Sequence, residues 1–142
     1  MKIEASLAPD GAFIPILLKC AEFSLLNIVY FLIDTGSAIS ALSIRDIGDS
    51  INYNVFEKKT EAAIGIGGSL ECYLINDVYL YVLTTEEKWI QLHKFDKMCL
   101  LPPSKDLRTN RTIYLPSILG RDYIGLHSEL FYLKNEVYLE IN

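Results

Sequence analysis

The stretch FLIDTGSAIS, residues 31–40, carries the strongest structural signal in this chain of 142 residues. Its first residues end an apolar run that begins at Ile28, and a run of this length predicts a β-strand buried on both faces. A small polar turn, Asp-Thr-Gly-Ser, follows at once. A carboxylate in this place is fixed by strand packing on one side and open on the other. Asp34 is therefore the candidate functional carboxylate.

Length and composition predict one globular domain spanning residues 1–142. The chain is long enough to bury a core of its own and too short for two full domains. Hydrophobic residues make up 51% and charged residues 22%, a balance that excludes a disordered or collagen-like chain. Nine Tyr and six Phe, together with many branched aliphatic residues, favour strands. We expect an all-β or β-rich fold.

Charge and hydropathy exclude two classes of partner. The net charge is −5, and the longest basic run is Lys58-Lys59, so no stripe of cations is present to neutralise phosphates. The N-terminal segment lacks the basic-then-apolar order of a signal peptide. The longest apolar stretch, residues 23–33, is about half of the roughly 20 residues that a membrane span requires. We expect a cytoplasmic protein that binds neither nucleic acid nor membrane.

Cysteine and histidine give no sign of a metal site. Cys20, Cys72 and Cys99 are widely spaced, odd in number and without a Cys-x-x-Cys pair, which argues against a disulfide framework or zinc ligands. They are expected to be buried small hydrophobes. His93 and His127 have no metal-ligand spacing and are assigned to the surface or to packing. No metal and no cofactor is expected.

The remaining patterns predict mainly strands and turns. A glycine-rich tip, Gly65-Ile66-Gly67-Gly68, indicates a hairpin whose end can move, or an ordinary turn. The predicted elements are a strand at residues 14–18, the hairpin at 61–83, a strand at 89–101, a surface loop at 102–111, a core segment at 113–119, a helical turn at 121–125 ended by Gly125, and a terminal hairpin at 130–141.

Three motifs occur in one order: the apolar strand ending in Asp-Thr-Gly, the glycine hairpin about thirty residues later, and Ile118-Leu119-Gly120-Arg121-Asp122 near the C-terminus. With these motifs the chain resembles the retropepsin family of dimeric aspartic peptidases, over residues 14–141. The resemblance implies that Asp34 is catalytic and that Ile64, Gly65, Ile66, Gly67 and Gly68 form a mobile flap over the substrate. It also implies that residues 118–124 form a core strand and short helix supporting the catalytic loop.

The same resemblance implies the architecture and the partners. The fold would be all-β with one short helix, a closed β-barrel of the acid-protease type with one lobe per chain. The reaction needs two carboxyl groups that share a proton, and Asp-Thr-Gly occurs once here, so the second Asp34 would come from another copy in a homodimer. The substrate would be an extended polypeptide, held by main-chain hydrogen bonds beneath the flap.

Residues beside Asp34 receive supporting roles. As in the family, Thr35 would lock the two loops together across the two-fold axis, and Gly36 would let the substrate backbone approach closely. Ser37 would brace the outer carboxylate oxygen or the loop backbone, or be a plain turn serine.

Two departures qualify the likeness. Retroviral members usually carry an acidic residue four positions after the catalytic aspartate, paired with the arginine of the Gly-Arg segment. This chain has Ala38 there and keeps Arg121, which therefore needs another partner or marks different substrate contacts. Residues 84–112 are also longer than in minimal viral enzymes. Among other acidic residues, Asp46 is expected to be a solvated turn residue and Asp122 to cap the helix or pair with a basic residue.

Three hypotheses remain. The first is an active endopeptidase, which the intact Asp-Thr-Gly favours. The second is a catalytically weak or inactive module of the same fold that binds peptides or dimerises. The third is an unrelated β-barrel in which the tripeptide is accidental.

Overall fold

The computed structural model of the chain describes residues 1–48, 51–61 and 70–141. Within them the regular structure is β-strand and single 3-10 turns, without an α-helix. None of the helical turns in the described residues has the length and apolar character needed to cross a bilayer. The elements are β1 (Lys2–Ala8), β2 (Gly11–Cys20), η1 (Ala21–Phe23), β3 (Leu25–Ile33), β4 (Ala41–Ser43), η2 (Ile44–Asp46), η3 (Tyr53–Val55), β5 (Glu57–Glu61), β6 (Leu70–Leu83), β7 (Trp89–Leu101), β8 (Ser104–Lys105), β9 (Thr112–Ile113), β10 (Ile118–Leu119), β11 (Glu129–Tyr132) and β12 (Val137–Glu140).

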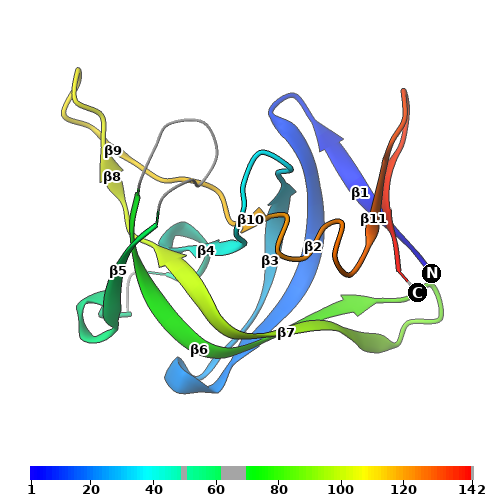
Figure 1. Cartoon of the computed structure of the whole chain (residues 1–142), viewed down its shortest axis with the longest axis horizontal. Coiled ribbons are helices and arrows are strands. Elements are labelled where there is room, and N and C mark those ends of the chain that lie inside the picture. The colour runs from blue at the N-terminus through cyan, green and yellow to red at the C-terminus, as the bar shows by residue number, and fades with distance from the viewer. Residues whose placement is uncertain (49–50, 62–69, 142) are drawn as a thin grey trace.

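Six of these strands close into a mixed β-barrel (Figure 1). Around the barrel they follow the order β2, β3, β10, β4, β7 and β6, and the pairing of β6 with β2 closes the ring. The pairs β3–β10 and β4–β7 are parallel, whereas the other pairs are antiparallel. The expectation of an all-β fold built on a closed barrel is confirmed.

The strands β2 and β3 are buried on one face only, and the expectation of two-sided burial was wrong. On β2, Ile14 and Ile16 are fully enclosed while Pro15 between them is exposed. On β3, Ile28 and Tyr30 keep 54% and 57% of their surface exposed. A barrel made from a single sheet takes one face of each strand into its interior, so the opposite face stays on the outside even when its residues are apolar.

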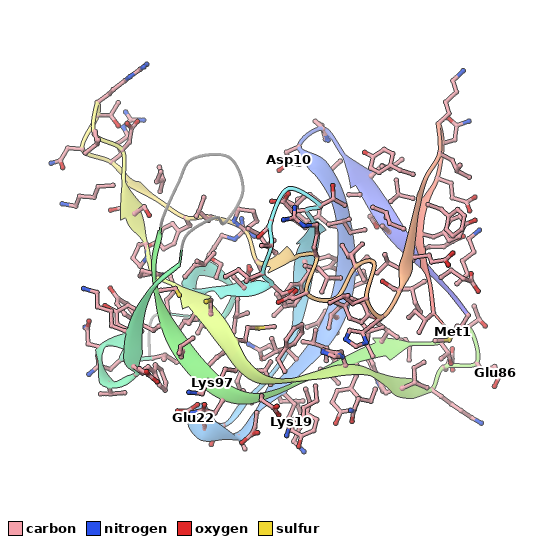
Figure 2. All side chains as sticks on the ribbon, in the orientation of Figure 1. Met1, Asp10, Lys19, Glu22, Glu86 and Lys97 are labelled. Carbon is pink, nitrogen blue, oxygen red and sulfur yellow. The ribbon has the colours of Figure 1, made fainter. Side chains whose placement is uncertain are left out.

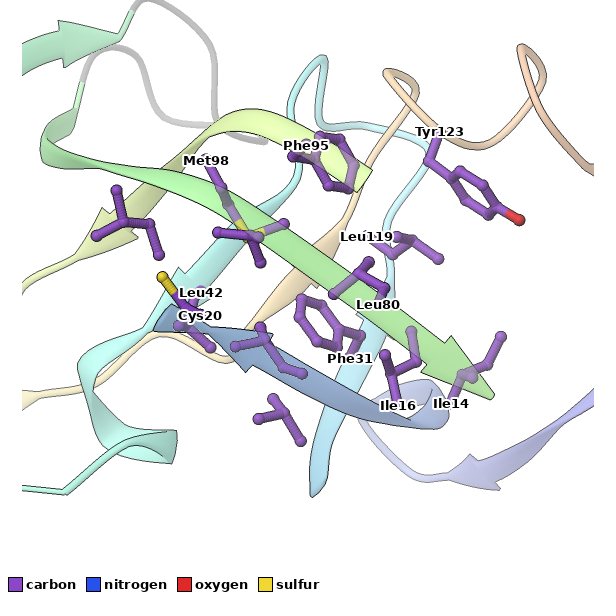
Figure 3. Packing of buried hydrophobic residues seen from close by; sticks show 14 of the residues in the cluster. Ile14, Ile16, Cys20, Phe31, Leu42, Leu80, Phe95, Met98, Leu119 and Tyr123 are labelled. Atoms are coloured by element: carbon purple, nitrogen blue, oxygen red, sulfur yellow. The ribbon is translucent and has the colours of Figure 1, made fainter. Parts of the chain in front are cut away.

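Large apolar side chains fill the interior (Figure 3). Among the fully buried ones are Ile14, Ile16, Leu18, Phe31, Leu42, Leu80, Leu100, Leu119 and Tyr123. A smaller cluster lies where β4, β7 and β10 meet, formed by Ala41, Cys72, Cys99, Leu101 and Ile118. All three cysteines are buried, as the sequence predicted.

The two ends of the chain pair with each other. The first half of β1, Lys2 to Ala5, lies antiparallel to β12, and its second half pairs with β2. The terminal hairpin expected at residues 130–141 is confirmed as β11 and β12, closed by the Leu133 N–H that donates to the Glu136 carbonyl over 2.8 Å. As Figure 1 shows, β11 therefore forms one edge of the larger sheet.

In place of the short helix expected at residues 121–125, the chain makes hydrogen-bonded turns. The N–H groups of Tyr123 and Ile124 both donate to the Gly120 carbonyl, over 3.1 and 2.9 Å. Gly125 then adopts φ +88° and donates its N–H to the Ser128 carbonyl over 2.8 Å. This left-handed residue directs the chain away before a second turn can form.

The packing predicts a large difference between inward and outward leucines. Leu80→Ala removes a fully buried side chain from the barrel and should lower the free energy of unfolding by about 2 to 5 kcal/mol. Leu26→Ala, on the outer face of β3 with 61% of its surface exposed, should change it by about 0.5 kcal/mol or less. Urea denaturation at one fixed protein concentration measures both, and equal losses would contradict this description of the core.

Candidate active site

Asp34 stands directly after β3, at the point where the strand leaves the barrel. Its backbone N–H donates to the Leu119 carbonyl over 3.1 Å, so the last link between β3 and β10 holds the aspartate itself. The side chain is half-buried. The sequence expectation of a carboxylate fixed by packing on one side and open on the other agrees with this position.

The following glycine holds one carboxylate oxygen. The Gly36 N–H donates to Asp34 Oδ1 over 2.9 Å, and the Ser37 N–H closes the turn on the Asp34 carbonyl over 3.2 Å. The buried Ser37 hydroxyl donates to the Ile39 carbonyl over 2.7 Å, so it braces the loop backbone and not the carboxylate. Thr35 is exposed.

The topology forces this loop to cross the end of another strand. Residues 34–40 connect β3 to β4, yet these strands are not neighbours, because β10 lies between them. Leu119 pairs in parallel with Ile33, and Ile118 pairs antiparallel with Ala41. The loop must therefore pass over the residue that follows β10.

That residue is Gly120, and the crossing leaves no room for a side chain. A Cβ at Gly120 would lie 2.4 Å from the Ile39 carbonyl oxygen and 2.9 Å from the Ser37 carbonyl oxygen. Both are backbone atoms of the loop, so they could yield only if the loop moved. The buried Gly120 thus sets how closely the loop packs on β10.

A second set of hydrogen bonds fixes the far end of the loop. Asp122 accepts hydrogen bonds from the Ser40 N–H at its Oδ2, over 2.8 Å, and from the Ser40 hydroxyl at its Oδ1, over 2.6 Å. The Ser40 hydroxyl in turn accepts the Gly120 N–H over 2.9 Å. Hydrogen bonds to a charged acceptor stabilise a fold by about 1.5 to 3 kcal/mol each. Asp122 is structural, as expected, but its partner is Ser40 and not a helix end or a basic residue.

Arg121 finds its partner on the loop backbone. Its Nη1 donates to the Thr35 carbonyl over 2.7 Å, and its N–H donates to the Ser37 carbonyl over 2.9 Å. The sequence left open which group would replace an acidic residue at Ala38. In this chain a main-chain carbonyl takes that place.

Hydrogen bonds at the end of β4 show that the expectation for Asp46 was wrong. The Ser43 N–H donates to the Ser117 hydroxyl over 2.9 Å, and that hydroxyl donates to Asp46 Oδ2 over 2.5 Å. Asp46 is therefore tied to the segment entering β10 and is not a solvated turn residue. Sequence reasoning missed Ser40, Ser43 and Ser117; the only signal was a polar residue, Ser117, within the segment 113–119 that was predicted as core.

The expected flap residues Ile64, Gly65, Ile66, Gly67 and Gly68 lie outside the described residues. The flanking strands β5 and β6 pair antiparallel, from Glu57 opposite Leu74 to Glu61 opposite Leu70. The role of the five residues remains a prediction. In the described part of the chain no three His, Cys, Asp or Glu side chains are grouped as metal ligands.

An apolar groove of about 610 Å³ lies elsewhere on the molecule. It is bounded by the start of β1, the outer face of β2 and β3, and the end of the β6–β7 hairpin, with Pro15, Tyr30 and Trp89 in its lining. Met1 and Glu86, labelled in Figure 2, mark this end of the molecule. Asp34 and its loop do not line the groove, so it is not the candidate active site.

Neither a scan against protein-family models nor a search of curated proteins found a match for this chain.

The loop crossing can be tested with two glycine variants. Gly120→Ala should cost about 1 to 3 kcal/mol of stability, because a methyl group must displace loop backbone. It should also speed amide hydrogen exchange at Ser37 and Arg121, whose N–H groups bond within the crossing. Gly125→Ala is the matched control: it meets no atom within 4 Å but strains a residue at φ +88°, costing about 1 to 2 kcal/mol. Loop exchange raised equally by both variants would show that the close approach at Gly120 is unimportant.

Proposed function

We propose that this chain is one subunit of a homodimeric aspartic endopeptidase with a retropepsin-like acid-protease fold, one lobe per chain and one Asp34 from each. The observation that carries the proposal is the loop crossing. A half-buried carboxylate follows a core strand, and its loop is fixed over Gly120 by partners from one C-terminal segment. This is the supporting role that the resemblance assigns to residues 118–122.

The chemistry follows from two carboxyl groups at contact distance. Two like charges about 3 Å apart cannot both ionise, so the pair holds one proton. The ionised carboxylate takes a proton from water as the water oxygen bonds to the scissile carbonyl carbon. The protonated carboxyl group hydrogen-bonds the carbonyl oxygen and gives it the proton. The C–N bond of the resulting diol then breaks as the amide nitrogen receives a proton from the pair and a diol hydroxyl returns one to it, which leaves a carboxylic acid, an amine and the pair with its single proton.

The loop prepares Asp34 for this role. The Gly36 N–H holds Oδ1, so the carboxylate is oriented before substrate arrives. Among the described residues no hydrogen bond reaches Oδ2, which leaves that oxygen for water or for the shared proton. Thr35 and Ala38 are exposed beside it, where a second loop would pack. An extended polypeptide would lie between the paired loops and the flap at Ile64–Gly68.

The subunit contact that we propose uses β11. The strands at the two ends of the chain, β1 and β12, pair with each other within the chain. The exposed backbone edge next to them belongs to β11, where Phe131 and Tyr132 keep 37% and 63% of their surface exposed, and Leu133 just after the strand keeps 51%. An apolar edge strand is a template for pairing with a second chain. Antiparallel pairing of β11 with its copy would satisfy a two-fold axis.

Asp34→Asn tests the catalytic assignment. The change is nearly isosteric and removes the shared charge, so peptide-bond hydrolysis should fall by about a thousandfold or more while thermal unfolding stays close to that of the parent. Cleavage of an unfolded polypeptide, measured from acid to neutral pH with and without a statine-type inhibitor, provides the readout. Asp10→Asn is the control, at the exposed turn between β1 and β2 (Figure 2).

Wild-type activity in Asp34→Asn would refute the proposal. A wild-type protein that dimerises and binds peptides but cleaves none under any condition would instead be the binding module of the same fold.

Mixing the chains tests the shared site. With about nine Asp34→Asn chains for each wild-type chain, random exchange leaves about one tenth of the activity per wild-type chain, because mixed dimers carry a single catalytic Asp. Activity per chain should also fall on dilution. A sedimentation-verified monomer that retains full activity would contradict the idea.

The β11 contact has its own control. Asp34→Asn chains that also carry Tyr132→Lys should no longer inhibit, because a lysine on an edge strand opposes pairing. Persistent inhibition by this double variant would show that the subunit contact does not involve β11, without contradicting the shared site.

A further inference from the structure

Residues 120–128 form a turn that supports the candidate catalytic loop. Its start carries the Arg121 and Asp122 side chains, which bond to the loop. Its own hydrogen bonds include the His127 N–H to the Tyr123 carbonyl, over 2.9 Å, and the Gly125 N–H to the Ser128 carbonyl. A displacement of this turn would therefore move the partners of the loop.

Four aromatic rings hold the turn against β7. His93 on β7 lies with its ring centroid 4.5 Å from that of His127 and 5.4 Å from that of Tyr123. Phe95 meets His93 edge to face at 4.5 Å, and Tyr123 stacks on His127 at 5.9 Å. Figure 3 shows Phe95 on β7 and Tyr123 on the turn.

A β-bulge supplies this contact. The β6–β7 pairing places Leu80 opposite His93 but Tyr81 opposite Gln91, so Leu92 is an extra residue on β7. Bulges redirect the side chains that follow them. Here the bulge adjoins His93, whose ring contacts both the Tyr123 ring and the His127 ring of the turn. The two histidines of the chain, separated by 34 positions in the sequence, thus lie in contact with their ring planes tilted by 35°.

Burial favours a neutral His93 ring. Burial lowers the pKa of His93 below its ordinary value of 6.5, and the His127 ring lowers it further, while Asp122 and Asp96 act in the opposite direction. Asp96 already pairs with the Lys94 ammonium at 3.2 Å, and Asp122 with Ser40. Burial raises the pKa of Tyr123 to about 12, so this ring stays neutral. On β6 the residue opposite His93 is the apolar Leu80.

We propose that His93 and His127 form a pH-sensitive latch for the candidate catalytic loop. With neutral rings, the stack holds residues 120–128 on β7 and keeps Arg121 and Asp122 on the loop. When acid protonates the rings, two like charges 4.5 Å apart repel, the turn loosens, and residues 34–40 lose their support. The conclusion that this loosening stops peptide cleavage rests on the proposed function, whereas the latch itself does not depend on it.

The sign of this pH dependence follows from the linkage between proton binding and folding. A histidine whose pKa is lower in the folded state binds its proton less readily there than in the unfolded chain. Its contribution to stability is complete above about pH 6.5 and declines as the pH falls from there to the folded-state pKa. Acid thus weakens the loop support on the side of the pH range where a shared carboxyl pair works. The histidine pair thus sets an acid limit on activity in addition to any limit that the carboxyl chemistry sets.

The experiment compares wild type with His93→Phe and His127→Phe, which keep a ring but cannot titrate. Imidazole NMR on the wild type should show two signals only, with coupled titration and one midpoint below 6.5. As the pH falls from 6.5 to that midpoint, the unfolding equilibrium constant of the wild type should rise by up to about tenfold per pH unit more than that of His93→Phe. Hydrogen exchange at the Ser40 and Arg121 amides, corrected for intrinsic rates, should accelerate over the same pH range.

Each outcome is decisive without a peptidase assay. Two uncoupled titrations near 6.5, or equal pH slopes in wild type and both variants, would overturn the latch. If one variant fails to fold, the other variant and the wild-type titration still decide. A protein that shows the latch but cleaves no polypeptide would refute the proposed function and leave the latch intact. In an active enzyme, His93→Phe should extend the acid limb of the pH profile.

Discussion

The position of β10 between β3 and β4 is the constraint on which the rest of this structure depends. Two strands joined by a short loop normally lie side by side, whereas here a strand from the far end of the chain separates them. The loop of residues 34–40 has to cross the inserted strand. Close packing at Gly120, the Asp122–Ser40 hydrogen bonds and the Arg121–Thr35 contact all follow from that crossing.

The same constraint accounts for a carboxylate at a strand end that is both ordered and accessible. The barrel fixes Asp34 through its N–H, the loop fixes Oδ1, and neither covers the remaining oxygen within the described residues. Side chains on rigid elements are already ordered, so little further conformational entropy is lost when a ligand binds. The apolar groove near Trp89 is a separate feature, because neither Asp34 nor its loop contributes to its lining.

Local patterns in the sequence were sufficient for several of the strands and for the two segments that meet at the loop. The apolar run before Asp34, the terminal hairpin and the β-strand at Trp89–Leu101 could all be predicted, because each signal lies within one window of residues. Burial was misjudged at Ile28 and Tyr30, since an apolar run does not reveal whether a second layer covers the strand. The short helix expected at residues 121–125 is replaced by hydrogen-bonded turns, although the chain does change direction at Gly125, where the sequence placed the stop.

The residues that were missed share a different property. Ser40 and Asp122 are 82 positions apart, and His93 and His127 belong to elements that meet only across the barrel wall. No periodicity or spacing within either segment encodes such a contact, because the partner is set by topology. From the sequence, Asp122 and the histidines were expected to be structural, surface or packing residues, each considered by itself. Only the fold shows that they act on the same turn.

That turn has a further consequence for assembly. Residues 120–128 run directly into β11, so the segment that supports the loop also carries the exposed edge of the sheet. Ordering of that edge by a second chain would restrain the turn from its C-terminal side, while the ring stack restrains it against β7. The two restraints act on the same hydrogen bonds to Ser40 and Thr35. Dimer formation and ring protonation should therefore oppose each other in free energy: a chain already paired at β11 resists acid loosening, and acid loosening weakens pairing by an equal amount.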